Sequence, residues 1–249
     1  MDDYTRARIA ALCADALRRS GALGVLPTPL DAVHELTGVA RERLPVGGPL
    51  RELLLGALWF EERSLFVRAG GSAARRRFTE AHETAHLLCP WHAAALRVDT
   101  AAELSPFASG LEAEANYGAG QLIFQGDRFA REAATHERSL RTPFALAGVY
   151  GASRHAAAYH YAETHADPVA LVVAGRWPDA SARLPVWRTV ASPAFAGPVP
   201  PLDASHGLLA EAIEAARSTN EPVETTVGGL RAEVANNRHC HLVLLSTGG

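Results

Sequence analysis

Two histidines and a glutamate at metal-ligand spacing are the clearest chemical feature of this sequence. They stand in the segment His82-Glu83-Thr84-Ala85-His86. Residues four apart in a helix lie about one turn apart, so both imidazoles should project from one face and share a metal ion. Zinc lowers the pKa of a bound water towards about 7, and the neighbouring carboxylate of Glu83 can take that water's proton. The spacing therefore predicts a hydrolytic zinc site with Glu83 as its catalytic base.

A third ligand must come from outside this segment, and the sequence offers two candidates. His92 stands at the metzincin spacing, but Cys89 occupies that pattern's glycine position, and the chain has no methionine beyond its first residue for a methionine turn. Glu112 and Asn116 are four residues apart and share a helix face. We therefore expect Glu112 as the third ligand, with Asn116 accepting a hydrogen bond from a ligand histidine. A chance match, or a solvated acidic helix face, is the alternative interpretation.

Capping and turn residues define the elements that must position these side chains. Ser72 is a suitable N-cap for a helix that runs to about Leu88, and Pro90 ends it because proline cannot continue the backbone ladder. Hydrophobic spacing and turn signals give the other elements of this half of the chain. They are helices over Tyr4–Arg19, Leu30–Leu36 and Leu111–Phe124, and a β-hairpin over Leu53–Val67.

Beyond Asp127 the pattern changes twice, first to short helices and then, from Pro168, to strands. Two short helices about a turn are expected over residues 142–157. The later elements follow from apolar runs bounded by turn residues. They are strands over Val169–Val173, Leu184–Val190, Val223–Val234 and His241–Leu245, a helix over His206–Arg217, and a loop over Pro193–Pro201. The whole chain is thus predicted to be α+β.

Composition and charge narrow the class of protein. The chain has 249 residues, of which 48% are apolar, and a formal net charge of -3, so nothing electrostatic favours tight nucleic-acid or membrane binding. The N-terminus is acidic, and no apolar run approaches the roughly 18 residues that a membrane span needs. Cys13, Cys89 and Cys240 are too few and too scattered for a disulfide framework. We expect a cytoplasmic protein with reduced thiols.

Two segments resemble the ImmA/IrrE family of metallopeptidases. Residues 76–88, RRFTEAHETAHLL, resemble that family's arginine-phenylalanine-threonine entry into the zinc helix, and residues 112–119, EAEANYGA, resemble its second motif. Thr84-Ala85 replaces the usual leucine-glycine, and Phe124-Gln125 stands where methionine-proline is common. Neither departure removes a ligand.

The resemblance covers about the first half of the chain, and it implies that His82, His86 and Glu112 bind zinc while Glu83 is catalytic. It also implies a zincin-like, gluzincin-type helical peptidase module over 1–128, a helix-turn-helix-like segment over 129–166, and a C-terminal α+β, GAF-like domain over 167–249. Such proteins are zinc endopeptidases, with manganese as a second metal for activity, that cut a helix-turn-helix repressor in a stress, phage or mobile-element response. The oligomeric state is left open.

Other roles were weighed beside this one. The chain could instead be a regulator that binds DNA or a repressor, or a toxin–antitoxin component, with a structural or dormant zinc site. Arg154 and His155 would begin a recognition helix, but few basic residues lie nearby, which favours a packing or partner-docking role. Cys89 is better interpreted as a buried structural cysteine than as a redox switch. Tyr117 and His136 stay open as alternative oxyanion stabilisers.

Overall fold

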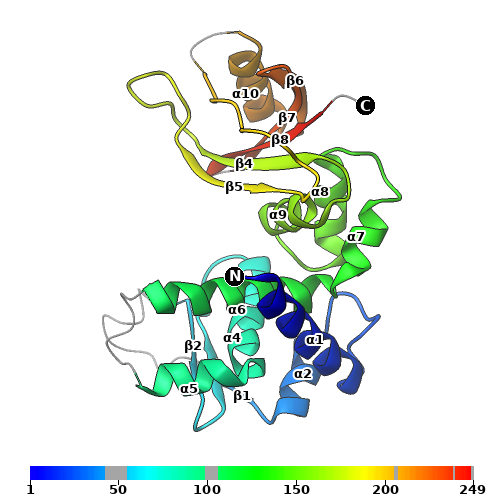
Figure 1. Cartoon of the computed structure of the whole chain (residues 1–249), viewed down its shortest axis with the longest axis vertical. Helices are drawn as coiled ribbons and strands as arrows, with labels where there is room; N and C mark the ends of the chain where they lie inside the picture. Colours follow the sequence, from blue (N-terminus) through cyan, green and yellow to red (C-terminus); the bar gives the residue numbers. More distant parts are fainter. Residues whose placement is uncertain (43–54, 99–105, 205–206, 238, 248–249) are drawn as a thin grey trace. The chain divides into compact units, whose positions relative to one another are not determined.

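The computed structural model describes residues 1–42, 55–98, 106–204, 207–237 and 239–247 (Figure 1). The chain divides into two compact units: Met1–Arg128 with Gly148–Ser153, and Phe129–Ala147 with Arg154–Gly249. Helices and two separate sheets confirm the predicted α+β class. The three functional parts proposed from the sequence, 1–128, 129–166 and 167–249, stay a prediction. Within the described ranges, no helix is both long and apolar enough to cross a membrane.

The first unit begins with two helices whose ends carry the expected capping signals. Helix α1, Asp3–Arg19, starts where the Asp2 carboxylate accepts a hydrogen bond from the backbone N–H of Thr5 at 2.7 Å. Helix α2, Leu30–Thr37, ends at Gly38, whose φ of 67° is the left-handed conformation that glycine adopts without strain. Both predicted helices are confirmed, each within a residue of its expected bounds.

A small sheet follows, and it contains the predicted hairpin. Strand β2, Gly56–Trp59, pairs antiparallel with β3, Ser64–Val67, while residues 53 and 54 of the predicted hairpin lie outside the described residues. Strand β1, Ala40–Glu42, pairs parallel with β3 and was not predicted. Its three residues are all exposed, so it carries no apolar alternation that could indicate a strand.

Helix α4, Ala73–Leu88, confirms the prediction for the motif helix, and Ser72 Oγ accepts a hydrogen bond from the backbone N–H of Arg75 at 3.2 Å. The chain then turns at once into helix α5, Pro90–Val98, which was not predicted. Proline stops one helix but suits the first turn of the next, where its missing N–H has no partner to lose. Helix α6, Pro106–Phe124, starts five residues before the predicted Leu111.

Gln125 is where the sequence departs from the second family motif, and it ties the end of α6 to the loop between α1 and α2. Its side-chain amide donates to the carbonyls of Ala22 and Val25 at 3.2 and 2.8 Å, and its Oε1 accepts from the backbone N–H of Gly24 at 2.8 Å. The departure therefore has a structural role away from the predicted ligands.

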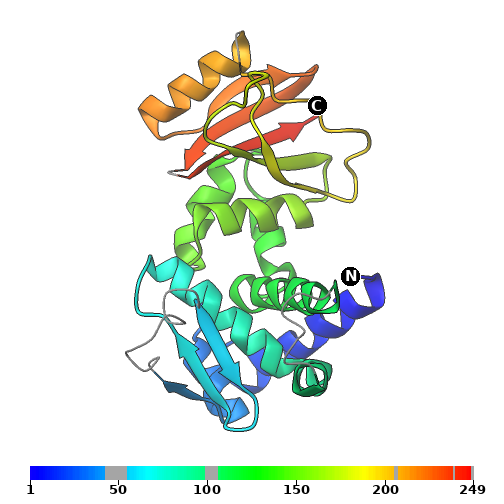
Figure 2. The same cartoon turned by 90° about the vertical axis from the view of Figure 1, so that its left-hand side faces the viewer.

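Three short helices follow, as expected: α7 (Asp127–Ala133), α8 (Arg141–Val149) and α9 (Arg154–Thr164). The second unit then builds an antiparallel sheet in the order β5-β4-β8-β7-β6. Its strands are β4 (Val169–Gly175), β5 (Val186–Ala191), β6 (Val223–Val227), β7 (Leu230–Asn237) and β8 (Cys240–Ser246). Helix α10, Leu208–Thr219, lies on one face and α9 on the other (Figure 2).

The two central strands explain why this sheet needs a cover on both faces. All seven residues of β4 and all seven of β8 are buried. On β4, Ala170, Val172 and Ala174 join the core that packs under α10, so the alternate residues face the α9 side. Continuous apolar runs of this kind indicate strands buried on both faces.

The predicted strand Val223–Val234 is wrong, because the chain folds back within it. Gly228 and Gly229 have φ values of 56° and 82° and form the turn between β6 and β7. A glycine pair between two alternating runs is a hairpin signal that outweighs the continuity of the apolar pattern. The other three strands are confirmed within two residues, and Pro193–Pro201 is a loop. The described start of α10 is Leu208, and the predicted start at His206 lies outside the described residues.

Candidate metal centre

Three side chains that the sequence predicts as ligands meet at one point between α4 and α6. His82 Nε2 lies 3.2 Å from His86 Nε2 and 3.2 Å from Glu112 Oε2. His86 Nε2 lies 3.4 Å from Glu112 Oε1. The four-residue spacing puts both imidazoles on one face of α4, and α6 supplies the carboxylate from across the helix contact.

The spacing of these donor groups is close to that of ligands around a tetrahedral metal ion. Zinc–nitrogen and zinc–oxygen bonds of about 2.0–2.1 Å place the corners of a tetrahedron about 3.3–3.4 Å apart. The two nitrogens are 3.2 Å apart, close to that edge length, and each lies near a different oxygen of the Glu112 carboxylate, His82 Nε2 at 3.2 Å from Oε2 and His86 Nε2 at 3.4 Å from Oε1. Within the described part of the chain the cluster has three donors, the number that catalytic zinc sites use while keeping a fourth position for water. The side chain of His86 is 6% exposed and that of Glu112 is 58% exposed, so solvent reaches the cluster from the Glu112 side.

Electrostatics keep the carboxylate of this cluster in its metal-binding form. Hydrogen bonds from His82 and His86 hold the pKa of Glu112 far below its usual range, against the opposing effect of burial. Burial works to lower the pKa of His82, but its contacts with Glu112, Glu83 and Asn116 raise it overall. The proton that His82 shares with Glu112 is therefore one that a metal ion would displace.

Asn116 lies where the sequence predicts it, beside the first ligand histidine. Its Oδ1 is 3.1 Å from His82 Nδ1. An amide oxygen only accepts, so Nδ1 carries a proton, and Nε2 becomes free to bind a metal once it gives up the proton that it shares with Glu112. This contact selects the tautomer that can bind a metal through Nε2.

Glu83 is half-buried next to the small sheet, in the setting that a catalytic base needs. Burial raises its pKa, while the neighbouring His82 and His86 lower it in part. A Cβ built on Gly56 of β2 would collide with Thr79 and approach Glu83 Oε1 to 2.9 Å. Only glycine leaves room there, so strand β2 limits the space available to the Glu83 side chain. Gly56 was not predicted as part of the site, and its one signal in the sequence was a glycine at the start of a strand.

The distance between α4 and α6, which carry the predicted ligands, depends on a glycine and an alanine. A Cβ on Gly118 of α6 would lie 2.6 Å from the Cβ of Ala85 on α4, so the helices touch through their smallest residues. Ile9 of α1 lies 3.4 Å from the same position, and Cys13 Sγ contacts the Gly118 carbonyl at 3.7 Å. Glu112 stands less than two turns before Gly118, so this contact sets how closely its carboxylate approaches the histidines.

A second layer of polar groups lies behind His86, and the sequence analysis did not find it. His92 Nδ1 is 2.8 Å from His86 Nδ1, and His92 Nε2 is 3.0 Å from Glu114 Oε2. Trp91 Nε1 donates to the same oxygen at 2.7 Å. His92 was rejected as a ligand, and in the structure it faces the ring nitrogen of His86 remote from Glu112. The acidic segment after Leu111 was the only signal for Glu114.

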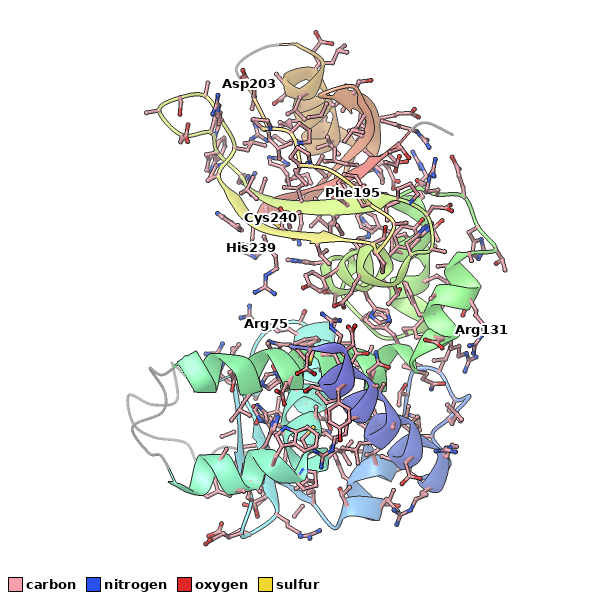
Figure 3. All side chains as sticks on the ribbon, in the orientation of Figure 1. Arg75, Arg131, Phe195, Asp203, His239 and Cys240 are labelled. Carbon is pink, nitrogen blue, oxygen red and sulfur yellow. The ribbon has the colours of Figure 1, made fainter. Side chains whose placement is uncertain are left out.

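The remaining candidates lie elsewhere or are chemically quiet. Burial raises the pKa of Cys89 to about 12, and the thiol of this buried residue stays protonated, as a structural cysteine requires. All three cysteines are buried and free, and Cys240 starts β8 (Figure 3). The Tyr117 ring lies 5.2 Å from the Arg6 guanidinium, and His136 belongs to the second unit. Nothing in these contacts chooses an oxyanion stabiliser.

A second set of three donor side chains, Asp31, His34 and Glu80, also lies close together in the first unit. Arg41 approaches this group and pairs with Asp31 at 3.8 Å and with Glu80 at 3.4 Å. His34 Nε2 is 2.9 Å from the Thr84 hydroxyl. The Arg41 guanidinium already balances the carboxylates of this group, which distinguishes it from the cluster around Glu112.

Comparison with known families finds a match, over the part of the chain that contains the predicted site. Residues 52–161 match the model of Peptidase_M78, described as the IrrE N-terminal-like domain. This stretch of the chain is similar to an IrrE N-terminal-like domain. The ImmA/IrrE resemblance is thereby confirmed, and the domain belongs to a family of metallopeptidases. The matched range of this IrrE N-terminal-like domain contains His82, Glu83, His86 and Glu112.

The fold of nearly the whole chain also has a counterpart among solved structures. A Mycobacterium tuberculosis transcriptional regulator matches 95% of this chain and 74% of its own, with a TM-score of 0.60 and 15% sequence identity. At that identity the match concerns the fold, and it extends beyond the IrrE N-terminal-like domain into the second unit. The search of curated proteins gives no match.

Proposed function

We propose that the protein is a zinc-dependent, gluzincin-type endopeptidase with a zincin-like catalytic module. The observation that carries this proposal is the convergence of His82 Nε2 and His86 Nε2, 3.2 Å apart, on the Glu112 carboxylate, whose two oxygens lie 3.2 and 3.4 Å from them. Two nitrogens and one carboxylate oxygen are a donor set that zinc prefers. The metallopeptidase family of the domain supports the same reading.

Each residue of the site has a distinct task in the proposed mechanism. Bound zinc would polarise the scissile carbonyl and acidify a water molecule. Glu83 takes the proton of that water on its carboxylate and passes it to the leaving amine nitrogen. Asn116 holds the ring of His82 by accepting from Nδ1. The partly buried position of Glu83 keeps its basicity higher than that of an exposed carboxylate.

For the substrate we propose a helix-turn-helix transcriptional repressor, cut in the cytoplasm during a stress, phage or mobile-element response. The family of the first unit and the likeness of the whole fold to a transcriptional regulator support this choice. We further propose that the second unit is a GAF-like sensor, supported by its five-stranded antiparallel sheet with helices on both faces. We also propose that manganese can take the place of zinc in supporting activity.

A second candidate is a regulator that acts by binding DNA or a repressor, or as a toxin–antitoxin component, with a dormant metal site. It is favoured by the fold likeness to a transcriptional regulator, which covers 95% of this chain. The packing of α9 speaks against a DNA-reading role, because Ala157, Ala158 and Tyr161 are buried and the helix lies on the sheet. The Arg154 guanidinium also lies over the Phe144 ring at 5.1 Å.

The deciding experiment incubates the full chain, loaded with zinc or manganese, with the product of a neighbouring repressor gene and scores fragments by mass spectrometry. Glu83→Gln should retain zinc and lose cleavage by about 10²–10⁴-fold, because the amide cannot take the proton. Glu224→Gln, at an exposed ion pair of the second unit, is the matched control and should cleave normally. Undiminished cleavage by Glu83→Gln would exclude Glu83 as the base, whereas no cleavage by the metal-loaded wild type would favour the binding regulator.

A further inference from the structure

The Nδ1 atoms of the two predicted ligand histidines, which face away from Glu112, have different hydrogen-bond partners. His82 contacts a neutral amide directly, with Asn116 Oδ1 at 3.1 Å from Nδ1. His86 contacts another imidazole, with His92 Nδ1 at 2.8 Å, and that imidazole contacts a carboxylate, with Glu114 Oε2 at 3.0 Å from His92 Nε2. The result is a linear chain from the cluster through His86 and His92 to Glu114.

Hydrogen-bond chemistry allows one placement of protons along this chain when His86 Nε2 is a metal ligand. Its Nε2 must then be unprotonated, so Nδ1 carries the proton and donates it to His92 Nδ1. His92 Nδ1 must therefore be an acceptor, which places the His92 proton on Nε2. That nitrogen faces the Glu114 carboxylate, which only accepts. Every donor in this placement meets an acceptor.

We infer that His92 and Glu114 are positioning residues that orient His86 and fix its metal-binding tautomer, with His92 carrying the influence of the carboxylate across to the ligand. This inference rests on the proposed metal site. An acceptor behind a ligand imidazole fixes the ring and raises its basicity as a ligand, and the loss of such a contact typically weakens metal binding about 10–100-fold.

The residues around His92 and Glu114 hold this row of hydrogen-bonded side chains in place. His92 is 0% exposed, so no water competes for its ring nitrogens. Trp91 Nε1 donates to Glu114 Oε2 at 2.7 Å and fixes the carboxylate from a second direction. The Arg8 guanidinium of α1 lies 4.2 Å from the centre of the Trp91 ring. Helices α1, α5 and α6 thus all contribute to the support of a ligand on α4.

The inference also explains why a helix missing from the sequence prediction is part of the site. Helix α5 supplies both Trp91 and His92, and it starts directly after the single residue Cys89 that caps α4. This short connection turns α5 back towards the ligand-bearing face of α4, where His92 reaches His86. A longer linker would leave the position of His92 far less constrained.

A graded set of variants tests the inference through zinc affinity, measured by competition with a chromophoric chelator. His92→Leu removes both contacts and should weaken zinc binding about 10–100-fold. His92→Asn keeps an acceptor near the Nδ1 position and should bind zinc with an affinity between those of wild type and His92→Leu. His34→Leu removes another buried histidine of the same unit, whose ring contacts Thr84, and should change the affinity less than about 3-fold. Equal zinc affinity in wild type and His92→Leu, or an equal loss in His34→Leu, would overturn the inference.

A second readout does not depend on zinc. In the metal-free full chain the Glu114 carboxylate still needs a donor from His92, so imidazole ¹⁵N–¹H NMR should find the proton of neutral His92 on Nε2 and not on Nδ1. Protonation of His92 on Nδ1 would overturn the inference even if zinc binds. Failure of the wild type to bind zinc would refute the proposed function, and the His92 tautomer would still decide whether the chain of contacts exists. If His92→Leu does not fold, Glu114→Gln replaces it, with weaker zinc binding expected and unchanged binding contradictory.

Discussion

The two units both bury polar side chains, but they use them differently. In the first unit, His82, His86 and Glu112 converge on one another, with separations of 3.2–3.4 Å. In the second unit, the buried Glu233 of β7 accepts hydrogen bonds from the Ser139 hydroxyl and the backbone N–H of Leu140, both at 2.8 Å. One arrangement leaves lone pairs pointing at a common centre, whereas the other satisfies them within the fold.

This difference teaches that burial of polar groups does not by itself identify a functional site. Two protein groups donate hydrogen bonds to the Glu233 carboxylate, so this residue stabilises the start of α8 without a bound ligand. The cluster around Glu112 must share protons among its own members until a cation replaces them. The first unit should therefore respond to metal and the second to changes in its apolar core.

The largest effect that can sharpen this contrast is a cavity in the second unit. Leu171 is fully buried at the centre of β4, and Leu171→Ala should cost about 2–5 kcal/mol of unfolding free energy. Hydrogen exchange of β4 and β8 should accelerate, while zinc affinity should stay unchanged. Leu208→Ala, at a position 62% exposed, is the matched control and should be nearly neutral. A loss of zinc affinity in Leu171→Ala would mean that the two units are not energetically separate.

Metal binding should stabilise one unit selectively. At free zinc 100 times its dissociation constant, the first unit should gain about 2.7 kcal/mol, because zinc binds the folded cluster and not the unfolded chain. Hydrogen exchange should slow in α4 and α6 and not in β4 and β8. His82→Ala removes one donor and serves as the control, since added zinc should then give little protection. Equal slowing in both units would break the contrast.

Adding one methyl group between α4 and α6 should push the two helices apart. Gly118→Ala would put a Cβ 2.6 Å from the Cβ of Ala85, which should cost about 1–3 kcal/mol of unfolding free energy and weaken zinc binding as Glu112 moves. Gly110→Ala lies on the same helix with no atom within 4 Å, so it should be neutral or slightly stabilising. Denaturant melts and zinc titrations of both variants test this, and equal behaviour would contradict the proposed role of the close packing.

The smallest effect concerns the cap of the motif helix. Ser72→Ala removes the acceptor for the Arg75 backbone N–H and should cost about 1 kcal/mol, measured by chemical denaturation. Ser72→Asp keeps an acceptor at the cap and should restore the stability. The cap is at the opposite end of α4 from His86, so zinc affinity should change little. A large loss of affinity would show that the cap also positions the ligands.

Much of the fold could be predicted because its signals are local. Apolar periodicity and capping residues predicted α1, α2 and α4 within a residue, and continuous apolar runs predicted the buried strands β4 and β8. The hairpin at Gly228-Gly229 was missed although its signal was present, because the apolar pattern runs through the turn. Strand β1 could not be predicted, since its pairing with β3 depends on residues more than 20 positions away.

The candidate site divides in the same way. That two imidazoles share a helix face follows from the sequence alone, because a spacing of four residues fixes their relative direction wherever the helix lies. It also nominated Glu112 and Asn116 through a second four-residue spacing. Neither spacing says how far apart the two helices lie.

The distance between the helices, and the residues behind the predicted ligands, come from tertiary packing. The contact of Gly118 with Ala85 brings Glu112 to within 3.4 Å of both histidines. The turn after α4 brings His92 to the back of His86 and to Glu114. The physical reason is that a helix fixes directions over a few residues, whereas the meeting of separate helices depends on packing across the whole core.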